Sequence, residues 1–292
     1  MNCPRPTGTA GTRAERRDVV IGFIGAGRMG GPMVSRLAAA GESVVVHTRT
    51  PAETVTRADG VATATDLADV VVDAGAVVVC VHTDDQVRAV CFEGGMLEAM
   101  RPGSVLIVHT TGDPRTVLGI SRAVSHRGID VVDAPVSGGP HDIEQGRVTT
   151  FVGGSADAFT AASAVIGHYS NPRFHTGALG SGQLTKLVNN AVFASNVAVL
   201  GAATELGRQF GIDDSVLARC LHRGSASSTA LDNVIRAGTF GAFAGAVEEF
   251  LAKDIAVVRE VAADFDVDMG LLETALDASN RSPHSTTTNG SH

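Results

Sequence analysis

A lysine and two asparagines stand at the head of a long apolar segment, in the stretch GQLTKLVNN (182–190). If the segment is helical, Lys186, Asn189 and Asn190 occupy positions i, i+3 and i+4 and share one face. An ammonium exchanges protons and an amide orients polar ligands, so this face suits acid–base chemistry on a bound substrate. Solvated side chains in the first turns of a helix would show the same spacing, and the spacing alone favours neither interpretation.

A glycine-rich turn near the N-terminus is the second chemical feature. Its pattern, G-x-G-x-x-G over 25–30, follows an apolar β-branched run and opens a helix-like segment. In that context the first glycine makes a tight turn, the second lets the backbone approach a pyrophosphate, and the third allows close helix–strand packing. A plain glycine turn is the alternative. We expect the turn to bind a dinucleotide through Gly25, Gly27, Arg28, Met29 and Gly30.

The end of the next expected strand indicates which dinucleotide is preferred. NAD enzymes usually carry Asp or Glu there to bind the ribose hydroxyls, whereas this chain reads His47-Thr-Arg-Thr50. A guanidinium pairs with a 2′-phosphate as a planar charged fork, and a threonine can add a hydroxyl. Arg49 and Thr50 therefore predict NADP(H) over NAD(H), unless Arg49 is merely a solvated loop charge.

A third motif, DAPVSGG (133–139), follows a later expected strand, at the edge where ligands bind in parallel sheets. Its turn of Ser137, Gly138 and Gly139 offers one hydroxyl and backbone N–H groups, and such a cluster suits a carboxylate. A flexible turn would explain the same residues equally well.

The elements that must position these motifs alternate between strand and helix. Apolar runs typical of buried parallel strands lie at 19–25, 43–48, 76–81, 104–109 and 129–135, and further strands are expected at 148–154 and 172–177. Beyond about residue 181 only helices are expected, at 182–210, 213–222, 229–237 and 246–266. The pattern predicts an α/β, doubly wound Rossmann-type parallel sheet followed by an all-helical C-terminal domain, with a long helix between them.

The chain of 292 residues is long enough for two domains. We expect a flexible extension over 1–18, an NADP-binding domain over 19–181, a helical substrate and oligomerisation domain over 182–279, and a flexible tail over 280–292. A helix that is apolar nearly all round must be buried, and in so small a helical domain we expect another subunit to be one of its packing partners. A homodimer or homotetramer is therefore expected.

Composition excludes several classes of partner. The net charge of −8 argues against nucleic acid as a partner. The sequence contains no run of about eighteen uninterrupted apolar residues, so we expect no membrane span. The four cysteines are scattered, which predicts neither a disulfide framework nor a metal site and favours a reducing, cytoplasmic setting.

Taken together, the motifs resemble those of the β-hydroxyacid dehydrogenase family, which includes 3-hydroxyisobutyrate dehydrogenase and tartronate semialdehyde reductase. Four segments carry the resemblance in the family's order: GAGRMGGPM (25–33), DAPVSGG (133–139), GQLTKLVNN (182–190) and KDI (253–255). The likeness implies hydride transfer between a nicotinamide cofactor and a small carboxylate-bearing 3-hydroxy acid or its semialdehyde or keto acid.

The resemblance also implies roles for matching residues. Lys186 matches the family's catalytic lysine, the general acid and base, and Asn190 matches an asparagine that orients substrate. Lys253 matches a lysine near the cofactor, and Thr111 matches a threonine beside the nicotinamide. The turn at 137–139 matches the carboxylate-binding turn of the family.

The chain departs from the family pattern on the substrate side. His82-Thr83 replaces a common Leu-Pro, the segment 140–144 replaces a Gly-Ala segment, and Ala246 replaces a phenylalanine. His82, His109 and His141 lie near the expected site, and we interpret each as an ordinary loop histidine. Two alternatives remain, an NADPH-dependent imine reductase-like enzyme and a non-catalytic NADP(H)-binding protein, although both usually lack the lysine.

Overall fold

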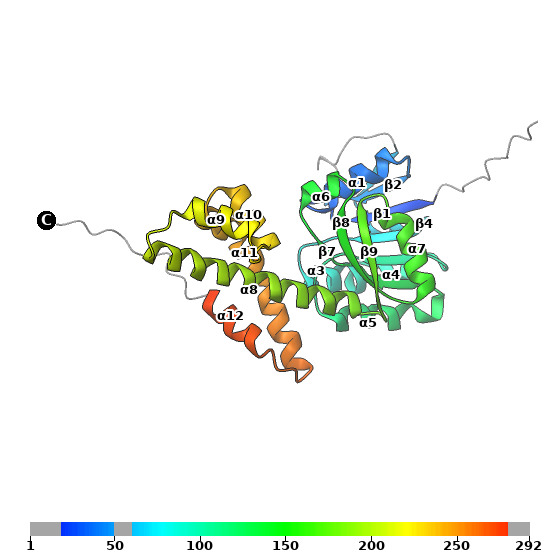
Figure 1. The fold of residues 1–292 in the computed structure, drawn as a ribbon. Coiled ribbons are helices and arrows are strands. Elements are labelled where there is room, and N and C mark those ends of the chain that lie inside the picture. The colour runs from blue at the N-terminus through cyan, green and yellow to red at the C-terminus, as the bar shows by residue number, and fades with distance from the viewer. Residues whose placement is uncertain (1–18, 50–59, 280–292) are drawn as a thin grey trace, which may run out of the picture.

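The structure, a computed structural model, describes residues 19–49 and 60–279. Thr50 and the expected extension and tail, 1–18 and 280–292, lie outside the described residues. Within the described ranges the chain forms a sheet domain and a helical part, joined by one long helix (Figure 1).

The sheet has nine strands within the described residues and the order β3-β2-β1-β4-β5-β6-β8-β7, with β9 paired to β8. The strands are β1 (Val20–Ile24), β2 (Val44–His47), β3 (Val61–Ala64), β4 (Ala74–Val79), β5 (Val105–Val108), β6 (Asp130–Asp133), β7 (Val136–Ser137), β8 (Val148–Gly153) and β9 (Ser170–Gly177). The first six strands in chain order pair in parallel, and β8 joins β6 antiparallel. The predicted Rossmann-type sheet is thereby confirmed.

Helices cover both faces of this sheet. They are α1 (Gly30–Ala39), α2 (Leu67–Val71), α3 (Asp84–Arg88), α4 (Met96–Ala99), α5 (Pro114–Val124), α6 (Pro140–Glu144) and α7 (Ala156–Ile166), with a π-helical turn over Ala89–Glu93 and a 3-10 turn over Ser125–Arg127. Buried side chains of α1, α6 and α7 form one core cluster with the sheet, and those of α2, α4 and α5 form another. The site loops are therefore anchored to strands that are packed on both sides.

The helical part comprises α8 (Ser181–Gln209), α9 (Asp214–Arg223), α10 (Thr229–Ala237), α11 (Phe240–Asp264) and α12 (Leu271–Ser279). In Figure 1, α8 leaves the sheet domain and runs through this part, with α9 and α10 on one side and α12 on the other. Residues of α8, α10, α11 and α12 share a separate core cluster. The expected all-helical segment is confirmed, although α11 begins six residues earlier than the expected 246, because Thr239 caps it by accepting a hydrogen bond from Ala242 N.

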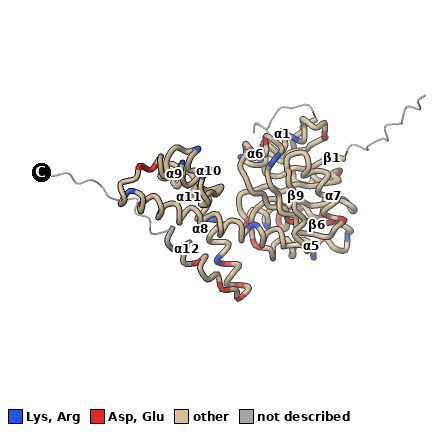
Figure 2. Tube along the Cα trace, viewed as in Figure 1, with Lys and Arg blue, Asp and Glu red and all other residues tan. Residues whose placement is uncertain are grey.

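One face of α8 is exposed and apolar in the single chain. Exposed large apolar residues recur about every turn or two turns along this face and at the residue that ends the helix: Leu184, Val188, Val192, Val199, Leu206 and, directly after α8, Phe210. Charged residues are rare along the helix, as the mostly tan tube of α8 shows in Figure 2. Among the described residues α8 is the one helix long and apolar enough to cross a membrane by length and composition, a test that core helices of soluble proteins also pass.

Candidate active site

The glycine turn between β1 and α1 has the shape that a dinucleotide requires. Gly25 has φ +95°, and a Cβ there would collide with the carbonyl group of Cys80. A Cβ on Gly30 would collide with the carbonyl oxygen of Gly25, so the helix can start this close to the strand only with glycine. Gly27, by contrast, is exposed, and a Cβ at this position would meet no atom within 4 Å. The open backbone at Gly27 fits the approach of a pyrophosphate.

The side chains expected beside the cofactor lie at the same edge of the sheet. Arg28 is exposed next to the turn, and Met29 packs half-buried against the core. Arg49 is exposed two residues after β2 ends, and Thr48 before it is buried, with its N–H donating to Ala64 O. The guanidinium of Arg49 is thus presented at the surface where the adenosine ribose would lie.

The start of α8 is fixed by a buried carboxylate of β6. Asp133 is fully buried, and its Oδ1 accepts from Gly180 N at 2.7 Å while Oδ2 accepts from Gln183 N at 2.6 Å. Burial raises the pKa of Asp133, and the backbone N–H donors oppose this rise by favouring the carboxylate. The first motif residue of DAPVSGG therefore caps the helix that carries Lys186.

Lys186 lies buried on this helix, close to a chain of polar side chains. Asn190 Nδ2 donates to Asp254 Oδ2 of α11 at 2.6 Å, and Asn189 Nδ2 donates to Asn190 Oδ1 at 3.1 Å. These two hydrogen bonds set the orientation of the Asn190 amide. Asn189, which had no expected role, therefore orients its neighbour, and Asn190 links the two long helices.

The second lysine lies at the mouth of the site. Lys253 Nζ donates to the backbone carbonyl of His82 at 2.9 Å and lies 3.6 Å from Asp254 Oδ1. That Oδ1 atom is buried and accepts no hydrogen bond within the described chain. Lys253 therefore ties α11 to the loop after β4, whereas Asp254 keeps one carboxylate oxygen available beside the lysines.

The electrostatics of Lys186 differ from those of an ordinary lysine. Burial lowers its pKa from 10.5 to about 8, Asp254 acts in the opposite direction and Lys253 adds to the lowering. Within the described residues its Nζ has no hydrogen-bond or ion-pair partner. The amine is therefore able to exchange a proton near neutral pH with a group that enters the site.

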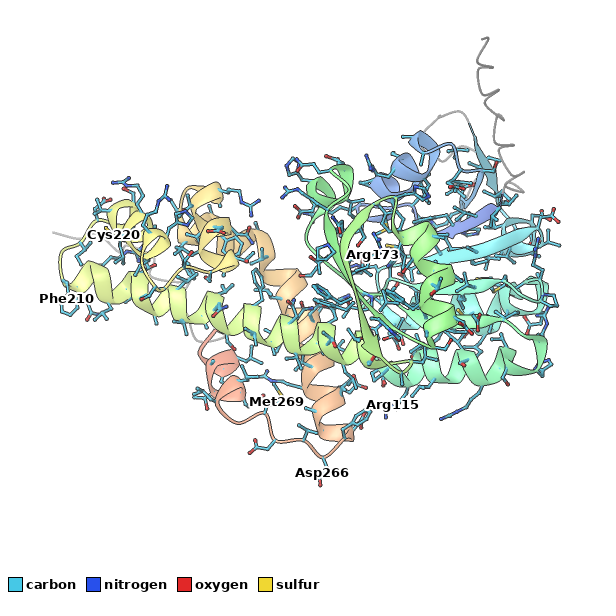
Figure 3. All side chains as sticks on the ribbon, turned by 45° about the vertical axis from the view of Figure 1, so that its right-hand side comes forward. Arg115, Arg173, Phe210, Cys220, Asp266 and Met269 are labelled. Carbon is cyan, nitrogen blue, oxygen red and sulfur yellow. The ribbon has the colours of Figure 1, made fainter. Side chains whose placement is uncertain are left out.

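A cavity of about 380 Å³ opens between the sheet domain and α11. Thr111 and Lys253 line it, together with charged side chains that include Asp84, Arg88 and Arg115. Arg115 forms ion pairs with both Asp113 and Asp264, and Figure 3 shows it where α5 meets the lower end of α11. The cavity is thus bounded by contacts between the two parts of the protein.

The Ser-Gly-Gly turn is less open than its sequence suggests. Gly139 N donates to Asp142 Oδ2 at 2.9 Å, and Arg147 pairs with the same carboxylate at 3.0 Å. This bond is a capping interaction at the start of α6, and it occupies one N–H group of the turn. The half-buried Ser137 hydroxyl makes no hydrogen bond within the described residues, so it is a donor that the turn retains.

The three histidines have different surroundings. His109 is buried rather than in an open loop: Nδ1 lies 2.5 Å from Ala134 O and Nε2 lies 2.8 Å from the Tyr169 hydroxyl. Burial lowers its pKa to about 4, which keeps the ring neutral. His141 is exposed on α6 near Glu144, and His82 is exposed beside the cavity.

The structure joins some of the expected site residues and not others. Asn190 and Lys253 both contact Asp254, whose charge also acts on buried Lys186, and Lys253 shares a cavity with Thr111. The turn at 137–139 makes no hydrogen bond to these residues. Asp254 was not predicted to act, although a lone carboxylate within the apolar run LAKDIAVV is a signal that could have identified it.

Comparisons with known proteins identify the family. The NAD binding domain of 6-phosphogluconate dehydrogenase matches residues 20–179, and the domain described as NAD-binding of NADP-dependent 3-hydroxyisobutyrate dehydrogenase matches 180–288. The mitochondrial 3-hydroxyisobutyrate dehydrogenase of Pongo abelii is 30% identical over 263 residues, which cover 86% of this chain and 78% of that enzyme. The chain belongs to the β-hydroxyacid dehydrogenase family.

Other members resemble this β-hydroxyacid dehydrogenase over most of its length. The 2-(hydroxymethyl)glutarate dehydrogenase of Eubacterium barkeri is 28% identical, and the match covers 89% of this chain and 87% of that enzyme. The structure of Mycobacterium tuberculosis 3-hydroxyisobutyrate dehydrogenase with L-serine has a TM-score of 0.77 at 24% identity, covering 90% of this chain and 93% of that one. The protein is accordingly an NAD(P)-dependent dehydrogenase or reductase that acts on CH–OH groups.

Proposed function

We propose that the protein interconverts a small 3-hydroxy acid and its semialdehyde or keto acid, with Lys186 as general acid and base. The observation that carries this proposal is the buried amine of Lys186, whose pKa is lowered to about 8 beside Asp254. The names of the relatives, dehydrogenases of 3-hydroxyisobutyrate and 2-(hydroxymethyl)glutarate, support a small hydroxy acid as the substrate class.

Each residue of the site has a step to perform. When bound at the glycine turn, the nicotinamide cofactor supplies or accepts the hydride at the carbinol carbon. In reduction, Lys186 hydrogen-bonds the carbonyl oxygen and donates a proton to it as negative charge develops. In oxidation the neutral amine accepts the hydroxyl proton. Asn190, held by Asp254, lies one helical turn further on the same face and orients the substrate oxygen.

The carboxylate of the substrate is proposed to bind at the Ser-Gly-Gly turn. Ser137 offers its hydroxyl and Gly138 its backbone, while Gly139 already donates to Asp142. Holding the substrate by its carboxylate places the reacting carbon, which is itself a large part of the rate enhancement. Thr111 and Lys253, which line the cavity, are proposed to border the nicotinamide side.

The activity is tested directly with a panel of 3-hydroxy acids, their semialdehydes and cyclic imines, following reduced-nicotinamide absorbance. Turnover of a hydroxy acid or its aldehyde supports the proposal. Cyclic imine reduction without hydroxy-acid activity would instead favour the imine reductase alternative. Cofactor binding without any turnover would favour a non-catalytic NADP(H)-binding protein.

A preference for NADP(H) is proposed from Arg49 and from the match to the domain of an NADP-dependent enzyme. Arg49→Ala should lower kcat/KM with NADPH by about tenfold or more, because a charge-assisted hydrogen bond contributes roughly 1.5–3 kcal/mol. Its kcat/KM with NADH should change little. Arg101→Ala removes an exposed arginine elsewhere on the sheet domain and serves as the control. Equal losses with both cofactors would contradict the assignment.

A homodimer or homotetramer is proposed from the exposed apolar face of α8. An exposed row of large apolar side chains along a helix of 29 residues is more than a soluble monomer usually exposes. Sedimentation of the purified full chain should therefore give the mass of two or four chains. Val188→Glu, which places a charge on the exposed apolar face of α8, should shift the mass towards that of a single chain. A monomeric wild-type protein would refute the proposal.

A further inference from the structure

The side chain of Gln183 makes hydrogen bonds that have no role in the proposed reaction so far. Its side chain is buried in the first turn of α8, three residues before Lys186. The side-chain Oε1 accepts from Gly112 N at 3.1 Å, and Nε2 donates to Thr110 O at 2.8 Å. One amide therefore binds the backbone on both sides of Thr111, as a neighbouring β-strand would, and this fixes the backbone dihedral angles of Thr111.

The same residue is held at its own backbone. Gln183 N donates to the buried carboxylate of Asp133, at the end of β6. The network continues in the other direction, because the Thr110 hydroxyl donates to Val81 O and accepts from Val81 N, both at 3.0 Å. The ends of β4, β5 and β6 are thus joined to the first turn of α8 through buried hydrogen bonds.

A buried polar side chain on a helix can also be satisfied locally. Half-buried Thr185, in the same turn, donates to Ser181 O, and buried Ser195 donates to Ala191 O, so both bonds remain within α8. Gln183 instead reaches backbone groups that lie 71 and 73 residues away in the sequence. Its hydrogen bonds fix the position of the loop at Thr111 relative to α8. Hydrogen bonds within α8 would not have this effect.

We propose that Gln183 is a positioning residue that holds Thr111, beside the nicotinamide site, in register with Lys186. Residues i and i+3 share a helix face, so the amide that grips the loop and the amine that exchanges the proton are carried by the same rigid turn. The inference rests on the proposed function, since it concerns the alignment of hydride transfer with proton transfer. Gln183 itself touches neither reacting group.

Three variants test the proposal. Gln183→Met keeps the size of the side chain and removes both hydrogen bonds. Gln183→Glu loses the donor to Thr110 O when ionised, but as a neutral acid it can donate to Thr110 O and accept from Gly112 N. Thr185→Val removes a hydrogen bond in the same turn without touching the loop and is the matched control.

The first measurement is hydrogen exchange of the peptide that contains Gly112, in the cofactor-free protein. Gln183→Met should accelerate exchange there, because the Gly112 N–H loses its acceptor. Thr185→Val should leave that peptide unchanged. Unaltered exchange in Gln183→Met would overturn the inference, and this readout does not depend on any substrate being known.

The second measurement is steady-state kinetics with NADPH and NADPH deuterated at C4. We expect Gln183→Met to lower kcat about tenfold to a hundredfold, as misalignment near the reacting atoms does, with a smaller change in KM and a larger deuterium isotope effect. A kcat within about twofold of wild type would contradict the proposal. If the wild-type protein turns over no hydroxy acid, the proposed function fails, whereas the exchange experiment still decides the role of Gln183.

The glutamate variant protects the test against a folding defect. Asp133 faces the backbone of residue 183 and should raise the pKa of the introduced acid, while Lys186, three residues further along α8, should lower it. The kcat of Gln183→Glu relative to wild type should rise as the pH falls and the acid becomes neutral. The same ratio for Gln183→Met should not vary with pH. A pH-independent ratio for Gln183→Glu would show that the two hydrogen bonds do not position the loop.

Discussion

Replacing Lys186 with methionine is expected to lower turnover by about a hundredfold or more, because the site loses its proton-exchanging group. NADPH should still bind, since the glycine turn and Arg49 lie on other elements of the chain. Single-turnover kinetics and a fluorescence titration with NADPH measure the two quantities separately. Ser195→Ala removes a buried hydrogen bond two turns further along α8 and should retain wild-type turnover. Near-normal turnover in Lys186→Met would refute the assigned role.

The pH dependence of kcat/KM in the wild-type enzyme should reveal the titration of Lys186. Burial places the pKa of Lys186 at about 8, so the ammonium predominates below that pH and the amine above it. Since kcat/KM reports groups of the free enzyme, reduction should weaken and oxidation should strengthen as the pH rises through about 8. In Lys186→Met, the residual activity should show neither the fall in reduction nor the rise in oxidation with pH.

The same substitution is expected to stabilise the fold at neutral pH. The pKa of Lys186 falls from 10.5 in the unfolded reference to about 8, so between these values the unfolded chain holds a proton that the folded chain has released. The destabilisation is therefore fully present below pH 8 and disappears as the pH rises towards 10.5. Lys186→Met should raise the free energy of unfolding at pH 7 by up to about 3 kcal/mol, an advantage that shrinks in alkali. Urea denaturation at several pH values measures this difference.

Sequence patterns predicted the architecture because they report local physics. Apolar β-branched runs and glycine turns placed β1, β4 and β5 within two residues of their observed bounds. β3 was missed, since the segment Val61–Ala64 is short, half-exposed and contains two alanines. β7 was missed because its two residues lie within a motif that was interpreted as a turn.

The candidate site was predictable only in part, because sequence patterns report local structure and several of the site's contacts join distant parts of the chain. Helical periodicity placed Lys186 and Asn190 on one face, but the partner of Asn190 is Asp254, 64 residues further along the chain. No local pattern predicts that pair, nor the contact of Gln183 with the loop at Thr111. The hydrogen bond from Gly139 to Asp142 is local, yet it depends on a side chain outside the recognised motif. Tertiary packing therefore decides which polar groups remain open to a ligand.

Alanine substitutions at Gly27 and Gly30 of the glycine turn form a matched pair, and the first is expected to cause a large loss of NADPH affinity. Gly27→Ala places a methyl group in open space on the cofactor side of the turn. The free energy of unfolding should change by less than about 0.5 kcal/mol, as is usual at exposed sites. NADPH affinity should fall about tenfold to a hundredfold, because the methyl group obstructs charge-assisted hydrogen bonds worth roughly 1.5–3 kcal/mol.

Gly30→Ala should behave differently, although it adds the same methyl group three residues later. Its Cβ would meet the carbonyl oxygen of Gly25 and the ring of Phe23, so α1 must shift away from β1. Such overpacking costs about 1–3 kcal/mol, and the cofactor-free protein should lose stability as well as affinity. Fluorescence titration with NADPH and denaturation of the cofactor-free variants separate the two cases. Unchanged NADPH affinity in Gly27→Ala would mean that the pyrophosphate does not cross this turn, whereas an equal loss of stability in both variants would mean that Gly27 is structural.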